Sequence, residues 1–258
     1  MTNAPLDYVP NLINAYKAGH AGDHVHLGYW GQAASQDWCD AQEAMTDLHL
    51  NALDLQDGQT AVDIGCGIGG SLRLVNTRVT DSMLIGVNID PRQLVICQTH
   101  PATRGNRFEW MHCDACDVPL ADYSTDRILS LEAMFHFPDR QRFLIEAARL
   151  LRPSGLLVCS DILFGKPRTT HENRLLDVVL QGYAPWPQPV LGQGAVTVMG
   201  HAVGLTSRRM LDLSAQVMPT WDHIVSSRDD PEKSPVAAMR DLHHAGLLQY
   251  LMYVFEKR

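Results

Sequence analysis

Short apolar segments alternate with helical segments between residues 60 and 164, and this order constrains the fold more than any other feature of the chain. Apolar stretches typical of strands cover residues 60–65, 83–89, 107–114, 126–135 and 155–164. Segments with helical periodicity cover residues 71–79, 91–100 and 139–151, the last closed by Arg152 and Pro153. Such crossovers place the strands in parallel with helices on both faces. The chain is therefore predicted to be an α/β protein with a Rossmann-like, doubly wound sheet.

The flanking segments complete this prediction. Helices are expected at residues 10–19, 37–55, 171–183, 195–205, 219–228 and 235–246. Two further strands are expected at 207–214 and 247–257, whereas residues 184–194 are rich in proline and glycine and predict a loop. The sheet should thus have seven mostly parallel strands. An N-terminal helical cap precedes it, and an inserted segment lies before the last strands.

Composition narrows the class of protein. The chain has 258 residues and a net charge of −8, which does not favour a nucleic-acid partner. It has no apolar stretch of the ~20 residues that a membrane span needs, and its N-terminus does not resemble a secretory signal. Six cysteines are scattered through expected core segments, which favours reduced thiols. We expect a cytoplasmic protein with no membrane partner; the oligomeric state stays open, with a homodimer among the alternatives.

A glycine-rich turn follows the first apolar segment. Gly65, Gly67 and Gly70 form the pattern G-x-G-x-x-G, typical of nucleotide-binding turns. Asp63 precedes them, and two unit charges about 4 Å apart interact by roughly 4 kcal/mol at an effective dielectric of about 20. A pyrophosphate would be repelled there, whereas the ammonium and sulfonium groups of S-adenosylmethionine would be attracted. The turn therefore predicts S-adenosyl-L-methionine as cofactor, with S-adenosyl-L-homocysteine as its product.

The motif and four later stretches carry a family resemblance. VDIGCGIGG resembles motif I of the class I S-adenosylmethionine-dependent methyltransferases. The other stretches that resemble segments of these enzymes are HLGYW (26–30), GVNIDPRQL (86–94), CDACDVP (113–119) and SLEAMFHFPDRQRFLIEAARLLRPSG (130–155). The resemblance implies one methyltransferase domain over 1–258. Its parts would be a cap or lid (1–56), a cofactor-binding core (57–164), an acceptor-pocket segment with late elements (165–235) and a C-terminal helix and strand (236–258).

The resemblance also implies the residues that contact the cofactor. Asn88 would hydrogen-bond the ribose where many relatives have an acid, and Gln93 or Asp90 would share this role. In chain order, the full set is Tyr29, Trp30, Asp63, Gly65, Gly67, Asn88, Ile89, Gln93, Asp114, Ala115, Leu131 and Glu132.

His136 is the predicted general base. It lies just after the expected strand 126–135, whose carboxyl end should face the site, and its unperturbed pKa of about 6.5 suits proton transfer. The stretch LEAMFHFPDR closely resembles the corresponding one in rebeccamycin-type sugar O-methyltransferases, which implies this role. The same resemblance implies Asp161 as the acid that orients the imidazole or binds the acceptor hydroxyl.

The acceptor is predicted to be a small molecule, a specialised metabolite methylated on oxygen. Its expected contacts are Tyr16, His26, Tyr183, Trp186, Met199 and Trp221. His20, His24 and His26 favour lid or surface roles, and Cys113 and Cys116 alone do not complete a zinc site, so we expect no metal. The alternatives are methylation of carbon or nitrogen, or methylation-coupled cyclisation, of a natural product or prenyl substrate. A nicotinamide oxidoreductase and a non-catalytic binding protein also remain.

Overall fold

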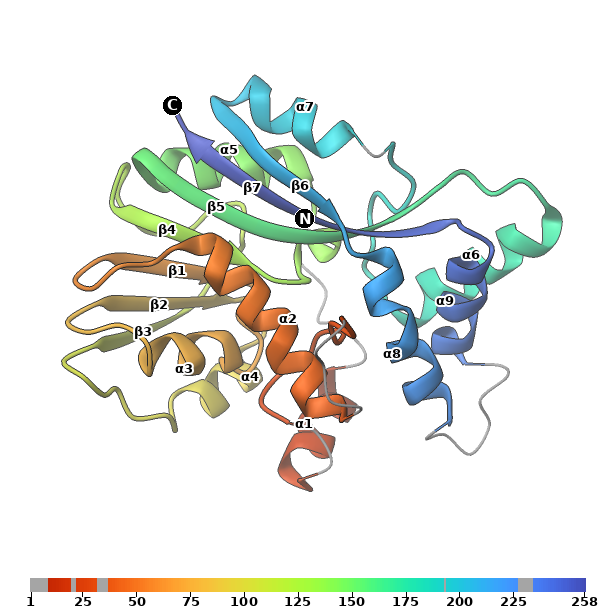
Figure 1. Cartoon of the computed structure of the whole chain (residues 1–258), viewed down its shortest axis with the longest axis horizontal. Helices are drawn as coiled ribbons and strands as arrows, with labels where there is room; N and C mark the ends of the chain where they lie inside the picture. The colour runs from red at the N-terminus through yellow and green to blue at the C-terminus, as the bar shows by residue number, and fades with distance from the viewer. Residues whose placement is uncertain (1–8, 20–21, 32–36, 193, 227–233) are drawn as a thin grey trace.

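A twisted seven-stranded sheet forms the centre of the protein (Figure 1). The computed structural model describes residues 9–19, 22–31, 37–192, 194–226 and 234–258. The strands are β1 (Thr60–Ile64), β2 (Met83–Asn88), β3 (Arg107–His112), β4 (Thr125–Ser130), β5 (Leu151–Phe164), β6 (Leu205–Asp212) and β7 (Leu248–Lys257). Their spatial order is β3-β2-β1-β4-β5-β7-β6. Only β7 runs antiparallel to its neighbours β5 and β6, so the predicted fold class is confirmed.

Several helices begin at side chains that cap their first backbone N–H groups. Asp37 accepts from the N–H of Cys39 at 2.8 Å, and Asp139 accepts from that of Gln141 at 2.8 Å. The helices are α1 (Val9–Lys17), α2 (Trp38–Leu53), α3 (Gly70–Asn76), α4 (Pro91–Cys97), α5 (Arg140–Leu150), α6 (Thr170–Gly182), α7 (Ala195–Ala202), α8 (Ser214–Ser226) and α9 (Pro235–His244), with the 3₁₀ turn η1 (Met134–His136).

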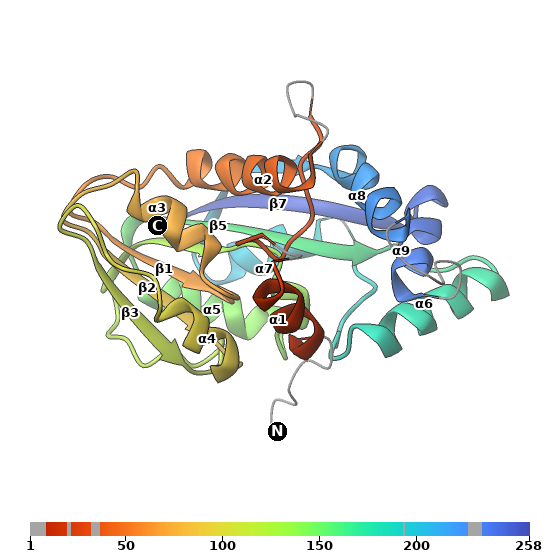
Figure 2. The ribbon, with the colours of Figure 1, turned by 90° about the horizontal axis from the view of Figure 1, so that it is seen from below.

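The two faces of the sheet build two separate hydrophobic cores. Consecutive strand residues point to opposite faces, so Leu129 packs in one core and Ile128 in the other. The first core receives side chains of α2, α3 and α8, and the second receives those of α5 and α7. Figure 2 shows these helices on either side of the sheet. Because both faces are covered, the central strands read as continuous apolar runs in the sequence.

Several boundaries differ from the sequence pattern. The expected strand 126–135 ends at Ser130, because Glu132 takes a left-handed φ of 54° that turns the chain out of the sheet. Helix α5 ends at Leu150 and β5 begins at once, so Pro153 lies in the strand. It is tolerated there because regular pairing with β4 resumes only at Leu156. Helix α8 begins at Ser214 and contains Pro219, where the pattern had it begin.

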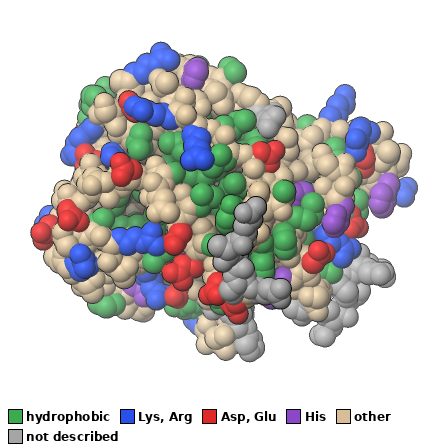
Figure 3. All heavy atoms as spheres, viewed as in Figure 1, with side chains coloured by type: hydrophobic (Ala, Val, Ile, Leu, Met, Phe, Trp, Pro, Cys, Tyr) green, Lys and Arg blue, Asp and Glu red, His purple; other side chains and the backbone are tan. Residues whose placement is uncertain are grey.

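Beyond the carboxyl end of β5, helices α6, α8 and α9 gather beside the sheet (Figure 1). On the face of the molecule seen in Figure 1, lysine and arginine side chains lie in small separate groups (Figure 3). None of the described helices combines the length and the apolar character needed to cross a membrane. The strand order reverses between β1 and β4, and a crevice for a ligand is expected outside the carboxyl ends of those strands.

Candidate active site

A pocket of about 300 Å³ lies at that reversal point. Its lining includes Asp63 after the middle of β1, Asn88 at the end of β2 and Glu132 just after β4. The N-terminal segment of residues 23–27 covers one side, and residues of α8, α9 and the segment after α6 form the far end. The pocket therefore has a polar half at the strand ends and a second half built by later elements.

Asp63 is the decisive polar group of the first half. Its side chain is 1% exposed, and its Oδ1 atom has no hydrogen-bond partner among the described residues. Burial raises the pKa of the Asp63 carboxyl to about 7. A buried carboxylate without a partner is costly, so a cationic group bound beside it would satisfy the oxygen and favour its ionised form. This arrangement fits the ammonium of S-adenosylmethionine.

The glycine turn brings three chain segments into close contact. Gly65 has a φ of +85°, and a Cβ on it would lie 2.4 Å from the Ala133 side chain, which lines the same pocket. A Cβ on Gly70 would lie 2.1 Å from the backbone oxygen of Asp23. Glycine is therefore required for the turn and for the approach of the N-terminal segment.

Asn88 and Gln93 form one hydrogen-bonded unit beside this turn. The Asn88 Nδ2 donates to Gln93 Oε1 at 2.8 Å and to the Gly67 carbonyl at 3.3 Å, while Asn88 Oδ1 accepts from the Ile89 N–H at 3.0 Å. Asn88, Ile89 and Gln93 line the pocket together. Asp90 does not line it: this carboxylate caps α4 and pairs with Arg92.

Cys113, Asp114 and Ala115 line the pocket after β3. One Asp114 oxygen accepts from the Cys116 N–H at 2.9 Å, which fixes the turn. Within the described ranges, no cluster of three or more His, Cys, Asp and Glu side chains could hold a metal ion.

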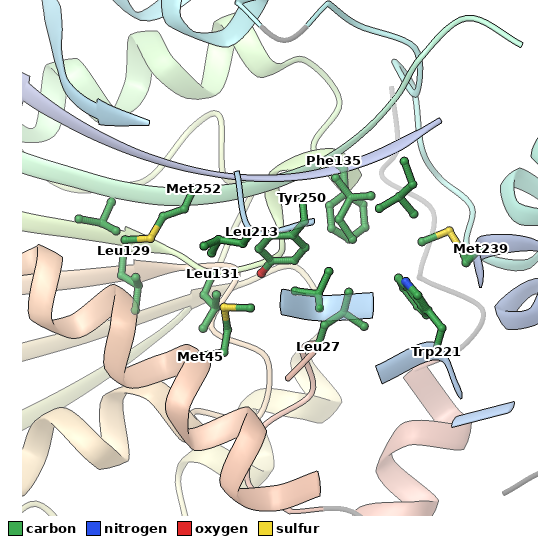
Figure 4. Packing of buried hydrophobic residues seen from close by; sticks show 14 of the residues in the cluster. Leu27, Met45, Leu129, Leu131, Phe135, Leu213, Trp221, Met239, Tyr250 and Met252 are labelled. Carbon is green, nitrogen blue, oxygen red and sulfur yellow. The ribbon is translucent and has the colours of Figure 1, made fainter. Parts of the chain in front are cut away.

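Glu132 connects the end of β4 to the N-terminal segment. Its N–H donates to Ser160 Oγ at 2.9 Å, and its Oε2 accepts from the Leu27 N–H at 3.0 Å. Burial raises the pKa of the Glu132 carboxyl to about 8. Figure 4 shows Leu27 and Tyr250 close to Leu131 on this side of the core. The Glu132 carboxyl group thus holds residues 23–27 over the polar half of the pocket.

The second half of the pocket is apolar and aromatic. Trp186 stacks on Phe135 with ring centroids 4.4 Å apart, and Trp221 of α8 faces Met239 of α9 (Figure 4). The other lining residues of this half include Ile162, Tyr183, Pro185 and Ile224. Among the described residues, no lysine or arginine lines the pocket. It therefore offers an uncharged ligand apolar contact area but gives an anionic one no lysine or arginine among the described lining residues.

His136 lies between the two halves, in η1. The ring nitrogen Nδ1 is 2.8 Å from the Pro185 carbonyl oxygen. A carbonyl only accepts, so Nδ1 carries the proton and the basic lone pair belongs to Nε2. Burial lowers the pKa of His136 to about 4, so the ring is neutral near pH 7. The geometry gives a neutral imidazole with a defined tautomer on the pocket wall.

Comparisons with known proteins agree with this site. A family model described as "Methyltransferase domain" matches residues 62–159. The chain is 37% identical over 212 residues to Methyltransferase GfsG of Streptomyces halstedii, covering 80% of this chain and 74% of that protein. The chain belongs to the methyltransferase family. The predicted enzyme class, an S-adenosylmethionine-dependent methyltransferase, is thereby confirmed.

Two further relatives show how far the similarity extends. The methyltransferase is 33% identical over 146 residues to 27-O-demethylrifamycin SV methyltransferase of Amycolatopsis mediterranei, covering 55% of this chain and 52% of that protein. It superposes on the geranyl diphosphate C-methyltransferase of Streptomyces coelicolor with a TM-score of 0.75, at 17% identity and over the full length of both chains. The second likeness shows a shared fold.

The methyltransferase places most of the predicted cofactor residues together, with two exceptions. Ten of the twelve line the pocket, and these are Asp63, Gly65, Gly67, Asn88, Ile89, Gln93, Asp114, Ala115, Leu131 and Glu132. Tyr29 and Trp30 do not. The Trp30 Nε1 donates to Thr220 Oγ1 at 2.8 Å, and Tyr29 packs against the hydrophobic core. The two rings anchor the N-terminal segment to α8 and the core, and their closure over the cofactor stays a prediction.

Residues 23–27 cover the pocket instead, and among them the sequence predicted lid or surface roles for His24 and His26 and an acceptor contact for His26. His24 Nδ1 lies 3.1 Å and His26 Nε2 lies 2.9 Å from Thr46 Oγ1 of α2. Burial lowers the pKa of His26 to about 3, so its ring is neutral. The signal available in the sequence was the H-x-H pattern itself, which marks two rings on one side of an extended segment. His20, the third histidine of the group, lies outside the described residues.

Four of the six predicted acceptor residues line the pocket and two do not. His26, Tyr183, Trp186 and Trp221 line the pocket. Tyr16 packs with Ile13, Ile68 and Ile96 beside α1. Met199 belongs to α7, which packs on the opposite face of the sheet. The structure does not bring these two side chains to the pocket, because aromatic and sulfur-containing residues also fill cores and sequence alone does not give the face.

Asp161 does not contact His136. Its carboxylate is fully buried and forms two hydrogen bonds with Arg140, Oδ2 to Nε at 2.7 Å and Oδ1 to Nη2 at 3.1 Å. It is not among the pocket-lining residues. The Pro185 carbonyl accepts from the imidazole where a carboxylate was expected, and a direct role of Asp161 toward the acceptor stays a prediction.

Proposed function

We propose that this methyltransferase methylates a hydroxyl oxygen of an uncharged, largely apolar small molecule, with His136 Nε2 as the general base. The observation that carries this proposal is the neutral His136 imidazole, fixed by the Pro185 carbonyl at the border of the apolar half. Base catalysis by such a group contributes ~10²–10⁴-fold.

The polar half would hold the cofactor. S-adenosylmethionine supplies a methyl group activated by a positively charged sulfur. Asp63 would bind its ammonium, the Asn88–Gln93 unit its ribose hydroxyls, and Asp114 with Ala115 its adenine. Glu132 would keep residues 23–27 over it through the Leu27 N–H. With these groups in place, the acceptor hydroxyl would lie beside His136, and such positioning lowers a barrier by roughly 7–11 kcal/mol.

The acceptor class follows from the lining of the apolar half. Trp186, Phe135 and Trp221 offer flat apolar surfaces, and the absence of lysine and arginine among the described lining residues disfavours phosphates and carboxylates. The name of the rifamycin relative specifies a molecule methylated on oxygen. The stretch around His136 resembles rebeccamycin-type sugar O-methyltransferases, which supports the same chemistry. The name of the S. coelicolor enzyme specifies methylation of a carbon atom of geranyl diphosphate. The pocket lining of this chain gives no reason to propose a diphosphate substrate.

Matched acceptors test the proposal directly. The enzyme is incubated with methyl-labelled S-adenosylmethionine and a panel of aryl and alicyclic alcohols, each beside its phosphate ester and its O-methyl ether. We expect label in the free alcohols alone, with the new methyl on oxygen by mass spectrometry and NMR. Transfer to the O-methyl ethers would indicate carbon as the acceptor atom, and preference for the phosphate esters would refute the acceptor class.

A further inference from the structure

Arg140 and Asp161 form the most deeply buried ion pair among the described residues, with exposures of 1% and 0%. Neither side chain lines the pocket. We propose that they are positioning residues for methyl transfer: Arg140, oriented by Asp161, holds residues 185–189 in the conformation that fixes the His136 imidazole. This inference rests on the proposed role of His136 as base.

The Arg140 guanidinium donates three hydrogen bonds, two to Asp161 and one to a backbone carbonyl. Asp161 accepts from Nε at 2.7 Å and from Nη2 at 3.1 Å, which is a side-on, two-point contact. The remaining nitrogen, Nη1, donates to the Gln188 carbonyl at 2.9 Å. A planar guanidinium held at two points has a fixed direction for its third donor. Asp161 thereby decides where the Gln188 carbonyl must lie.

The segment that Arg140 contacts has few backbone N–H groups with which to form hydrogen bonds of its own. Residues 184–189 read A-P-W-P-Q-P, and each proline lacks a backbone N–H. Their carbonyls therefore take donors from elsewhere: the Pro185 oxygen from His136 Nδ1 at 2.8 Å, the Gln188 oxygen from Arg140, and the Pro189 oxygen from the Phe164 N–H at 2.8 Å. Arg140 and His136 thus bind the same short segment at two points.

The chain geometry couples these two points. His136 belongs to η1 and Arg140 is the first residue of α5, so both side chains leave one corner of the backbone. If residues 185–189 shift, the Pro185 carbonyl leaves Nδ1 and the preference for the proton on that nitrogen is lost. The basic lone pair would then be shared between the two ring nitrogens. Trp186 would shift as well, because it lies in the same segment.

Stability alone does not account for the pair. Taking two charges out of water is costly, and replacing a buried ion pair by apolar residues of similar volume is often neutral or stabilising. A pair kept only for folding would therefore have little advantage at this position. Its geometric consequence, one fixed donor for the Gln188 carbonyl, is what apolar residues cannot reproduce.

The first test compares two arginines of the same helix. Arg140→Lys keeps the charge but loses the three-point geometry, and we expect kcat to fall roughly 10- to 100-fold while the cofactor Kd stays unchanged. Arg149→Lys is the control, because Arg149 also donates to backbone carbonyls, of Val118 and Leu120, and does not line the pocket. It should keep wild-type kcat. Wild-type kcat in Arg140→Lys would overturn the proposal.

The double variant Arg140→Met/Asp161→Leu covers the case in which Arg140→Lys does not fold. It removes both charges together, so no unpaired charge is left in the core. We expect it to fold and bind S-adenosylhomocysteine like the wild type, with kcat reduced roughly 10- to 100-fold. Wild-type kcat in this variant would show that the pair is structural only.

A double-mutant cycle then asks whether the effect passes through His136. In the His136→Ala background, Arg140→Lys should cause little further loss of kcat, because the group that it positions is gone. A full additional 10- to 100-fold loss would mean that Arg140 acts on something else and would overturn the proposal.

The nitrogen-15 chemical shifts of the His136 ring give a readout that needs no activity. The wild type should show the proton on Nδ1, with the signals assigned by their loss in His136→Ala. The double variant should show a mixture of tautomers, and an unchanged tautomer there would overturn the positioning role. Wild-type activity in His136→Ala would refute the base instead, so the two failures are distinguishable.

Discussion

The two halves of the pocket are built in different ways. The polar half, which we propose holds the cofactor and call the cofactor half, lies at the ends of β1, β2, β3 and β4, and some of its polar groups are held by hydrogen bonds within one segment, such as Asn88 to Gln93. The acceptor half is assembled from η1, residues 183–186, α8 and α9, which are far apart in the chain. The comparison teaches that one half can retain its chemistry while the other changes its shape, and His136 stands where they meet.

Removing His136 should have the largest effect. His136→Ala should lower kcat by ~10²–10⁴-fold, because a positioned base contributes that much, and leave the Kd of S-adenosylhomocysteine unchanged. His171→Ala, an exposed histidine on α6, is the control for general effects. Initial rates with labelled cofactor and isothermal titration measure the two quantities. Equal losses of cofactor binding and of rate would break the division between the halves.

Asp63→Asn tests the cofactor half alone. Because hydrogen bonds to charged groups are worth ~1.5–3 kcal/mol, the Kd of S-adenosylhomocysteine should rise roughly 10- to 150-fold. Since burial raises the pKa of Asp63, its charge destabilises the free folded state at pH 8, so the variant's Tm should be equal or higher. A lower Tm together with unchanged affinity would mean that Asp63 has only a structural role.

The same carboxyl predicts a pH dependence of binding. A ligand cation favours ionised Asp63, whose pKa in the free enzyme is raised to about 7. Below that pH binding must displace a proton, so affinity should fall by up to about tenfold per unit between pH 7 and pH 5. The ligand's own amino group stays protonated over this range. Calorimetry at several pH values checks this, and Asp63→Asn should flatten the profile.

Trp186→Leu tests the acceptor half. Losing the stacked ring on Phe135 removes roughly 0.5–1.5 kcal/mol beyond the lost area, so the acceptor KM should rise about 2- to 10-fold or more. The cofactor Kd should not move. If cofactor binding weakened as strongly as acceptor binding, the two halves would not be independent.

Met199→Leu should have the smallest effect. The residue packs on the face of the sheet away from the pocket, and a swap of similar volume usually costs less than about 1.5 kcal/mol of stability. Acceptor KM and kcat should stay at wild-type values, although the sequence pattern placed Met199 among the acceptor contacts. Steady-state kinetics with the alcohols described above measures both, and a raised KM would extend the acceptor half to α7.

The sequence determined the fold class and most of the cofactor half. Strands β1 and β2 and the second half of β5 are apolar because both sheet faces are covered there, and that burial gives continuous apolar runs in the sequence. The site residues of this half lie at or just after the carboxyl ends of the strands, so Asp63, Asn88 and Asp114 were found by position along the chain. Parallel strands bring their carboxyl ends to one edge, which makes the local order equivalent to the spatial one.

Only the tertiary structure decided the acceptor half and the partners of His136. Whether Tyr183 or Met199 faces the pocket depends on how α7, α8 and residues 184–189 pack, and no short-range pattern records that packing. The same holds for Asp161, which stands at a strand position typical of a catalytic acid but is paired with Arg140. A buried guanidinium lies closer to that carboxylate than the imidazole does, and the proline-rich segment supplies the imidazole with a carbonyl. These contacts join residues distant in the chain, so their physical cause is the folded arrangement itself.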